Sequence, residues 1–182
     1  MIRRRFLIAS ACGFVTVALA ASLAGPRKAL AIGPDEQQAE LANAMSGVKV
    51  SLHQGLTASE REGQPISGKF EVENGKLQLS VYTAKDGKFS EVIVDHVTGS
   101  IAKAEPITEG EDLTHAKAQK AAMDRAKVKL ADAATKAKGQ AKGEAADVIV
   151  VSVVPELKDS RLEAAIVLLQ GKKFSTVTQR LD

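Results

Sequence analysis

The chain of 182 residues is poor in the side chains that usually carry covalent or metal chemistry, with one cysteine, three histidines and no tryptophan. The single cysteine, Cys12, lies in an apolar N-terminal run that we expect to be cleaved off. A mature chain without Cys12 can form no disulfide, no zinc-thiolate site and no thiol nucleophile. The sequence also lacks a Gly-x-Ser-x-Gly elbow and a His-Glu-x-x-His pair. These absences argue against most enzyme classes, so we expect no catalytic residues, no metal and no cofactor.

An excess of positive charge is also missing once the N-terminus is set aside. The chain has 25 basic and 22 acidic residues, and five of the basic ones lie in the first 31 residues, which contain no acid. The remainder therefore carries 20 basic against 22 acidic side chains. Nucleic-acid binders generally present a basic surface, so we expect no nucleic-acid partner.

Residues 1–31 have the three parts of an export signal. Arg3 begins a basic start, residues 6–23 are apolar, and Ala29 and Ala31 are small residues at the two positions that a signal peptidase reads. We predict cleavage after Ala31, a periplasmic or secreted protein, and no stable membrane span after cleavage. A second candidate cut lies after Ala24. An uncleaved anchor stays open, because about 17 apolar residues are the lower limit of a spanning helix.

The start of this leader resembles a twin-arginine signal. Arg3-Arg4-Arg5-Phe6-Leu7 matches the pattern Arg-Arg-x-Phe-Leu, whereas Ile2 and Ile8 depart from the usual flanking residues. Export by the twin-arginine route and export by the general secretory route therefore both remain open.

The segment after the leader predicts helices followed by a strand meander. Residues 35–45 have a helical pattern, and Ser51 with Gln54 forms a capping box that begins a second helix, which Gly63 stops. Strict alternation then predicts strands at 69–73, 77–81 and 89–94, with the core positions Phe70, Leu79 and Val92. Asn74-Gly75 is a strong hairpin signal between the first two strands.

The same order of elements is predicted a second time. A long helix is expected over 114–138, followed by strands at 147–154, 162–169 and 174–181, with turns at 155–161 and 171–172. An internal duplication follows from this order. The predicted fold class is α+β, with two repeats of a helix followed by a three-stranded antiparallel meander, the helix packed on one face of the sheet. The predicted units span residues 35–107 and 112–182.

The first unit resembles the PepSY domain family. The matching features are Val50-Ser51-Leu52 at the start of a helix, the hairpin at Glu73-Asn74-Gly75, and the stretch Phe89-x-x-Val92-x-Val94-Asp95-x-x-Thr98-Gly99-x-Ile101. The second unit is similar to a divergent copy that lacks the Asp-x-x-Thr-Gly turn. The resemblance implies a non-enzymatic, exported binding protein that inhibits or modulates an envelope or secreted peptidase. The alternative is a small-ligand or cation-binding accessory protein of the envelope.

Asp95, Thr98 and Gly99 are interpreted as a structural turn, in which Asp and Thr bond the backbone and Gly supplies positive φ. The strands of the second unit are apolar on both faces, which is typical of strands buried on both faces. One helix covers one face only, so the first unit, a second copy or a protein partner is expected to cover the other. The residues assigned to this candidate interface are Val151, Val153, Val167 and Leu169. An exposed strand edge would pair with the peptidase.

Overall fold

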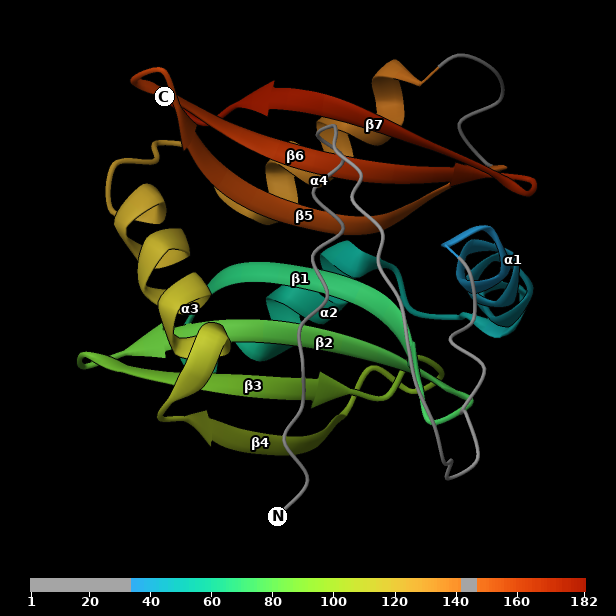
Figure 1. Cartoon of the computed structure of the whole chain (residues 1–182), viewed down its shortest axis with the longest axis horizontal. Coiled ribbons are helices and arrows are strands. Elements are labelled where there is room, and N and C mark those ends of the chain that lie inside the picture. The colour runs from blue at the N-terminus through green and yellow to red at the C-terminus, as the bar shows by residue number, and fades with distance from the viewer. Residues whose placement is uncertain (1–33, 142–146) are drawn as a thin grey trace, which may run out of the picture.

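The computed structural model describes residues 34–141 and 147–182, so the predicted signal peptide, with Ala29 and Ala31, lies outside the described residues. The described chain has an α+β fold with one antiparallel seven-stranded sheet, in the order β4-β3-β2-β1-β5-β6-β7 (Figure 1). The helical elements are α1 (Pro34–Ala44), the 3-10 turn η1 (Met45–Gly47), α2 (Leu52–Ser59), α3 (Gly110–Met123) and α4 (Leu130–Gln140). The strands are β1 (Gln64–Glu73), β2 (Lys76–Lys85), β3 (Lys88–Val94), β4 (Ile101–Ile107), β5 (Val148–Lys158), β6 (Arg161–Gln170) and β7 (Lys173–Arg180).

Local sequence signals account for most of the first half. The Ser51 side chain accepts a hydrogen bond from the backbone N–H of Gln54, and the Gln54 side chain accepts one from the backbone N–H of Ser51, so the capping box is confirmed. Asn74 and Gly75 have φ values of 52° and 72°, the positive angles that a tight hairpin turn needs. The turn places Phe70 opposite Leu79.

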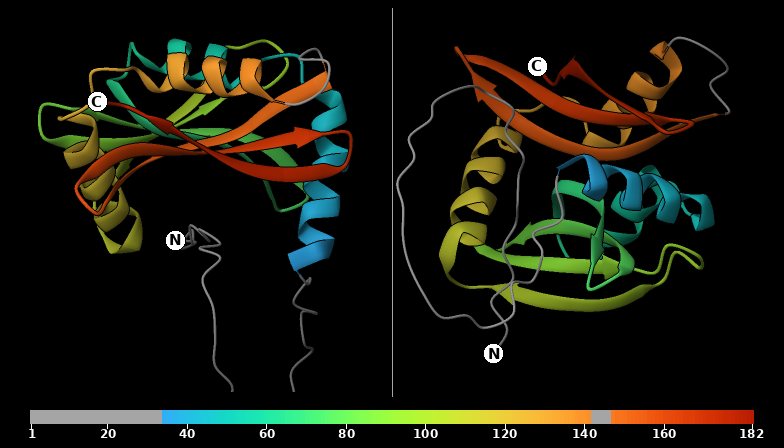
Figure 2. Two further views of the ribbon diagram at one scale, coloured as in Figure 1. Left: turned by 90° about the horizontal axis from the view of Figure 1, so that it is seen from above. Right: turned by 45° about the vertical axis from the view of Figure 1, so that its right-hand side comes forward.

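The sheet has two faces that the helices cover differently. Seen from the side, α2 and α4 lie together along one face, here called the helix face, while α1 and α3 extend from opposite ends towards the other, here called the second face (Figure 2). A Cβ on Gly68 would meet Leu56 and Leu52, so α2 packs directly on β1. Phe70, Leu79 and Val92 are 2%, 0% and 0% exposed, which confirms them as core positions.

The predicted layout of two repeats, each with a three-stranded meander, is matched only in part. The two meanders are joined into one sheet, because β1 pairs with β5 through Gly68↔Val153 and Lys69↔Ser152. The buried core residues of both halves form a single cluster. Joining two strand edges satisfies backbone groups that would otherwise be unpaired, which is the physical reason for the larger sheet.

The single long helix expected over 114–138 is also wrong, because the structure has α3 and α4 with a break at residues 124–129. In the break, the backbone N–H groups of Lys127 and Val128 both donate to the carbonyl oxygen of Leu181, at 2.7 and 3.1 Å. Gly68 lies on the helix face, and neighbouring residues of a strand point to opposite faces, so Ser67 points to the second face. There its Oγ donates to Gln119 of α3 at 2.8 Å. A straight helix cannot lie on both faces, so the chain must turn between α3 and α4.

Two boundaries differ from the sequence prediction. The edge strand β4, which contains Pro106 and pairs with β3 from Phe89↔Ile107 to Val94↔Ile101, was not among the predicted strands. The turn expected over 155–161 is shorter, because β5 continues through Pro155 to Lys158. Asp159 and Ser160, with φ values of 49° and 66°, form the turn.

Candidate functional site

The Asp95 turn is held by its own backbone and side chains. Oδ1 of Asp95 accepts hydrogen bonds from the N–H groups of Val97 at 2.9 Å and Thr98 at 2.7 Å. The Thr98 hydroxyl oxygen accepts from the N–H of Ser100 at 3.3 Å, and Gly99 has a φ of 77°. The backbone hydrogen bonds from Thr98 and then Val97 lower the pKa of the Asp95 carboxyl. The three motif residues are thus engaged in turn geometry, as the sequence indicated.

The four residues assigned to the candidate interface do not share one surface. Val151, Val153 and Leu169 are 3%, 0% and 2% exposed, and only Val167 is partly exposed. The β5–β6 register shifts between Val150 and Ser152, so Val150 and Val153 both lie opposite helix-face residues of β6. The expected strict alternation through Val151 and Val153 is therefore broken by a bulge. Buried side chains are not available to a partner, so Val151, Val153 and Leu169 do not form an exposed interface.

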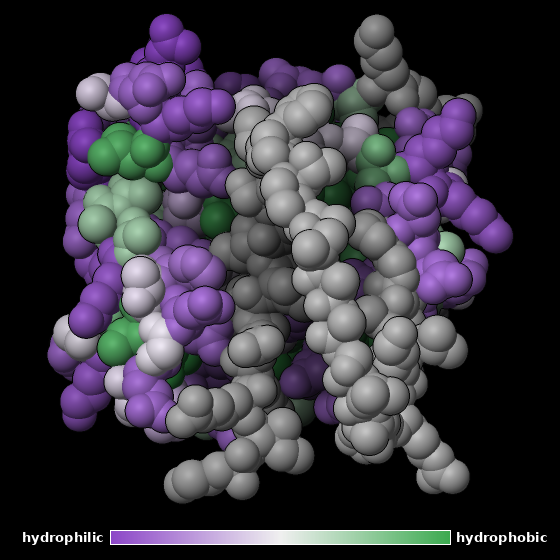
Figure 3. Space-filling model, in the orientation of Figure 1, coloured by the Kyte–Doolittle hydropathy of each residue, from purple (hydrophilic) through white to green (hydrophobic). Residues whose placement is uncertain are grey.

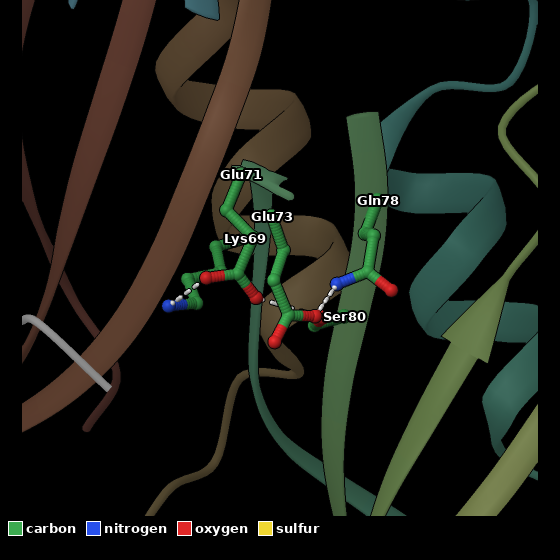
Figure 4. A network of polar contacts seen from close by, with 5 residues as sticks. All are labelled: Lys69, Glu71, Glu73, Gln78 and Ser80. Carbon is green, nitrogen blue, oxygen red and sulfur yellow. Dashed lines mark hydrogen bonds and ion pairs between the residues drawn. The ribbon is translucent and has the colours of Figure 1, made fainter. Parts of the chain in front are cut away.

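The centre of the second face carries a polar network on β1 and β2 (Figure 4). Lys69 Nζ lies 2.5 Å from Glu71 Oε2, and Ser80 Oγ donates to Glu71 Oε1 at 2.9 Å. Gln78 Nε2 donates to Glu73 Oε2. The side chains of Lys69 and Glu71 are 18% and 28% exposed, so this network is partly desolvated. The two contacts between β1 and β2, Ser80–Glu71 and Gln78–Glu73, fix the strand register, because a one-residue slip would separate both pairs.

Next to this network, α3 covers Tyr82. Burial, and then the neighbouring carboxylate of Asp112, raise the pKa of the Tyr82 hydroxyl, which bonds Asp112. The phenol therefore stays protonated and acts as a donor. In the described chain, Asp112 Oδ1 and His115 Nδ1 are buried atoms without a hydrogen-bond partner.

The three histidines lie apart. His53 contacts Thr135 Oγ1 at 3.1 Å across the α2–α4 interface, whereas His96 follows β3 and His115 lies in α3. Among residues 34–141 and 147–182, no three His, Cys, Asp or Glu side chains are grouped as metal ligands.

Two hollows lie at the end of the sheet next to α3. A cavity of about 270 Å³ on the helix face is lined mainly by apolar residues. Lys129 and Glu60, which also line it, form an ion pair with 3.0 Å between Nζ and Oε1. A larger groove of about 470 Å³ lies between α3 and the end of β5. Its lining residues are His115, Ala118, Gln119, Val154, Pro155, Glu156, Leu157 and Lys158. In the space-filling view, hydrophobic surface appears among hydrophilic surface on the side where α3 lies (Figure 3).

The sequence prediction missed this groove because it interpreted Pro155 as part of a turn. A proline within a strand usually marks an edge or a bulge. The apolar residues around Pro155 therefore indicated that the strand could continue through the proline. The two outer strands, β4 and β7, are the places where backbone edges of the described sheet are open to pairing.

Comparison with known proteins assigns no relative to the chain. No family model matches it. No curated protein and no solved structure matches it significantly. In the part of the chain that the structure describes, no helix is both long and apolar enough to span a membrane.

Proposed function

We propose that this chain is an exported, non-enzymatic binding protein of two PepSY-like units that modulates an envelope or secreted peptidase. The observation that carries the proposal is that the strands of the described residues belong to one antiparallel sheet, whose outer strands β4 and β7 each have a neighbour on one side only. Such strand edges are templates on which an extended segment of another protein can pair. The mature chain would begin at Ile32, in the periplasm or outside the cell.

The two-unit interpretation is supported by a backbone contact that occurs twice. Before α2, the N–H groups of Lys49 and Val50 both donate to the carbonyl oxygen of His96, at 3.0 and 3.1 Å. Before α4, the N–H groups of Lys127 and Val128 donate in the same way to Leu181. In each half, the chain thus ties the start of the helix to the residues just after the third strand of the meander. The second unit would then consist of α3, α4 and β5 to β7, within residues 112–182.

Of the two outer edges, β7 is the better candidate for pairing with a partner. β4 contains Pro106, which has no N–H to donate, and a Lys103–Glu105 ion pair at 2.6 Å. Charged residues and proline are devices that protect an edge from pairing. β7 contains no proline, and Thr176 and Thr178 are exposed along it.

A proline scan of β7 tests this function. Thr176→Pro and Val177→Pro remove N–H groups that point to opposite sides of the strand, one towards β6 and one outward. We expect the variant that loses the outward N–H to keep its melting temperature. The same variant should lose both the capture of the peptidase and the effect on the rate at which the peptidase hydrolyses its substrate. Ala104→Pro on β4 is the matched control and should leave both unchanged. A peptidase that is captured and modulated equally by all three folded variants contradicts the assignment to β7, and capture of no peptidase contradicts the function.

The alternative function is small-ligand binding, and the cavity at the α2–α4 junction is the observation that favours it. Leu56, Met123 and Leu130 are nearly fully buried in its lining. A hollow of this kind suits a compact apolar ligand better than a cation. A rise in melting temperature with small apolar compounds, abolished by a filling substitution such as Ala131→Leu, would support this alternative.

A further inference from the structure

The backbone registers of the two meanders match at a constant offset of 85 positions. The matched pairs, first and second meander in turn, are Glu73↔Lys76 with Lys158↔Arg161, Leu79↔Val94 with Ala164↔Gln179, and Lys85↔Lys88 with Gln170↔Lys173. The irregularity within the first strand repeats at the same offset, after Pro65 and after Val150. At the join, Gly68 pairs with its own counterpart, Val153. In this correspondence β7 is the counterpart of β3.

The two counterpart strands differ in what lies on their outer side. β3 is paired there with β4, whereas no strand of the described residues pairs with the outer side of β7 (Figure 1). Val92 of β3 lies opposite Ala104 of β4 and is 0% exposed. Its counterpart in β7, Val177, is partly exposed. Within the described residues, the place of an eighth strand beside β7 is therefore unfilled.

The backbone of β7 presents hydrogen-bonding groups on this open side. Gln170 and Lys173 flank a two-residue turn, and the residues that flank such a turn bond to each other. Because the direction of the N–H groups alternates along a strand, those of Phe174, Thr176 and Thr178 point outward. Residues 174–179 are uncharged and include no proline. An antiparallel segment can therefore pair with β7 without displacing its bonds to β6.

The charges at the two ends of β7 differ in how they are compensated. Lys172 and Lys173 are exposed at its start and form no ion pair within the described residues. At the other end, Arg180 donates from Nε and Nη2 to the Asp182 carboxylate, both at 2.9 Å. The C-terminal end of an antiparallel segment lies beside the start of β7. Such a segment therefore meets uncompensated positive charge at its C-terminal end.

β4 shows what a strand in the equivalent place presents. Ile107 of β4 is half-buried and lies opposite Phe89, the counterpart of Phe174. Glu109 follows Ile107 two residues later. β4 and the residues after it thus present an apolar residue and then an acid, in the direction that an antiparallel segment on β7 requires.

We propose that the outer edge of β7 binds one extended antiparallel segment of the partner peptidase, with an apolar residue opposite Phe174 and acidic residues after it. This site rests on the proposed function and adds the direction and the chemistry of the bound segment. The acids lie beside Lys172 and Lys173 and neutralise them. β-branched residues suit the positions opposite Thr176 and Thr178, because such side chains pack well across strands.

A second copy of this chain fits the open edge poorly. Within the described residues its own open edges are β4 and β7, and β4 contains a proline, which protects an edge from pairing. Pairing of β7 with β7 about Thr176 brings Lys172 against Arg180. Pairing about Val177 brings Lys172 against Asp182, whose carboxylate is already in an ion pair. An acidic segment of a different protein is therefore the better occupant.

The test uses two labelled peptides of identical composition with blocked termini. Val-Thr-Val-Thr-Ile-Glu-Glu has its acids at the C-terminal end, and Glu-Glu-Val-Thr-Val-Thr-Ile has them at the N-terminal end. We expect the full mature chain to bind the first about tenfold more tightly, since two charge pairs are gained. Lys172→Glu with Lys173→Glu should abolish this preference. The matched control, Lys117→Glu with Lys136→Glu at exposed positions of α3 and α4, changes the net charge equally and should keep it.

Thr176→Pro removes an outward N–H and should weaken the binding of both peptides at least tenfold. Equal affinity for the two peptides, or a preference that survives the Lys172 and Lys173 exchange in a folded variant, overturns the site. If that double variant does not fold, Lys172→Gln and Lys173→Gln should each reduce the preference about threefold. Self-association in sedimentation that Thr176→Pro abolishes would replace the peptidase segment with a second copy and overturn the site.

Failure of this site and failure of the proposed function are distinguishable. Capture of a peptidase that requires the β7 edge, without the preference for the C-terminal acids, overturns the acidic segment and leaves the function in place. The peptide preference without capture of a peptidase overturns the function and leaves the binding edge.

Discussion

Asp95 illustrates how one side chain holds a turn that residues far away depend on. Its Oδ1 accepts two backbone hydrogen bonds, and its own N–H donates to Ser100 O at 2.8 Å. The turn presents the carbonyl oxygen of His96 to Lys49 and Val50, just before α2 begins. A carboxylate accepts these bonds better than a carboxylic acid, which is why its pKa is lowered.

The lowered pKa of Asp95 makes its contribution to stability depend on pH. The contribution is present above the pKa of the unfolded carboxyl and is lost as pH falls through the lower folded pKa. We expect Asp95→Asn to be less stable than the parent chain at neutral pH, with a difference that shrinks towards zero in strong acid. Urea denaturation at about pH 7 and about pH 2 measures this difference. The control Thr98→Val removes only a weaker side-chain hydrogen bond to the Asp95 carboxylate, so its loss of stability should depend on pH less than that of Asp95→Asn, and an equal dependence would contradict the explanation.

At the scale of elements, small residues decide how closely a helix approaches the sheet. A Cβ on Gly55 of α2 would lie 2.4 Å from Leu79 Cδ2, and Leu79 is fully buried. Gly139 in α4 faces open space, because a Cβ there would meet nothing within 4 Å. The same substitution is therefore expected to have opposite effects in the two helices.

We expect Gly55→Ala to lower the free energy of unfolding by about 1–3 kcal/mol, because the added methyl must displace Leu79 in a packed core. Gly139→Ala should be neutral or stabilising by about 0.5 kcal/mol through helix propensity. Denaturant titration of each variant measures both values. In the double variant Gly55→Ala with Leu79→Val, the loss should be smaller than the sum of the single losses. Simple additivity would mean that the two side chains do not compete for space.

At the scale of the whole molecule, the two halves are joined both through the sheet and through the helix layer. β1 meets β5 at the centre of the sheet, and α2 packs against α4 on the helix face. His53 of α2 also contacts the Ala131 carbonyl oxygen at 3.2 Å. The joined core is the reason to expect one cooperative unit rather than two independent domains.

Tyr82 gives a direct test of this cooperativity, because it is the only tyrosine and the chain has no tryptophan. Its fluorescence reports on the first half and on the contact with α3, whereas far-ultraviolet circular dichroism reports on both halves. We expect the two signals to change in one coincident transition on urea denaturation, and Ile166→Ala in the second half to shift both to the same extent. Two separated transitions would show that the halves unfold independently.

The features that the sequence by itself determined are local ones. The capping box at Ser51, the positive φ at Asn74 and Gly75, and the inward position of Phe70 each depend on residues within a few positions of one another. Caps, turns and strand alternation are set by short-range sterics and hydrogen bonding, so their residue patterns are sufficient. The α+β class followed from these elements.

Only the tertiary structure decided where the long helix breaks, how the two sheets join and where β5 is left unpaired. The α3–α4 break depends on the Leu181 carbonyl oxygen, which is the acceptor for Lys127 and Val128 although it lies far along the chain. The bulge near Val151 and the two-pair ladder between β1 and β5 likewise depend on strands that are distant in sequence. Non-local pairing has no local residue pattern, since its free energy arises only when both partners are folded together.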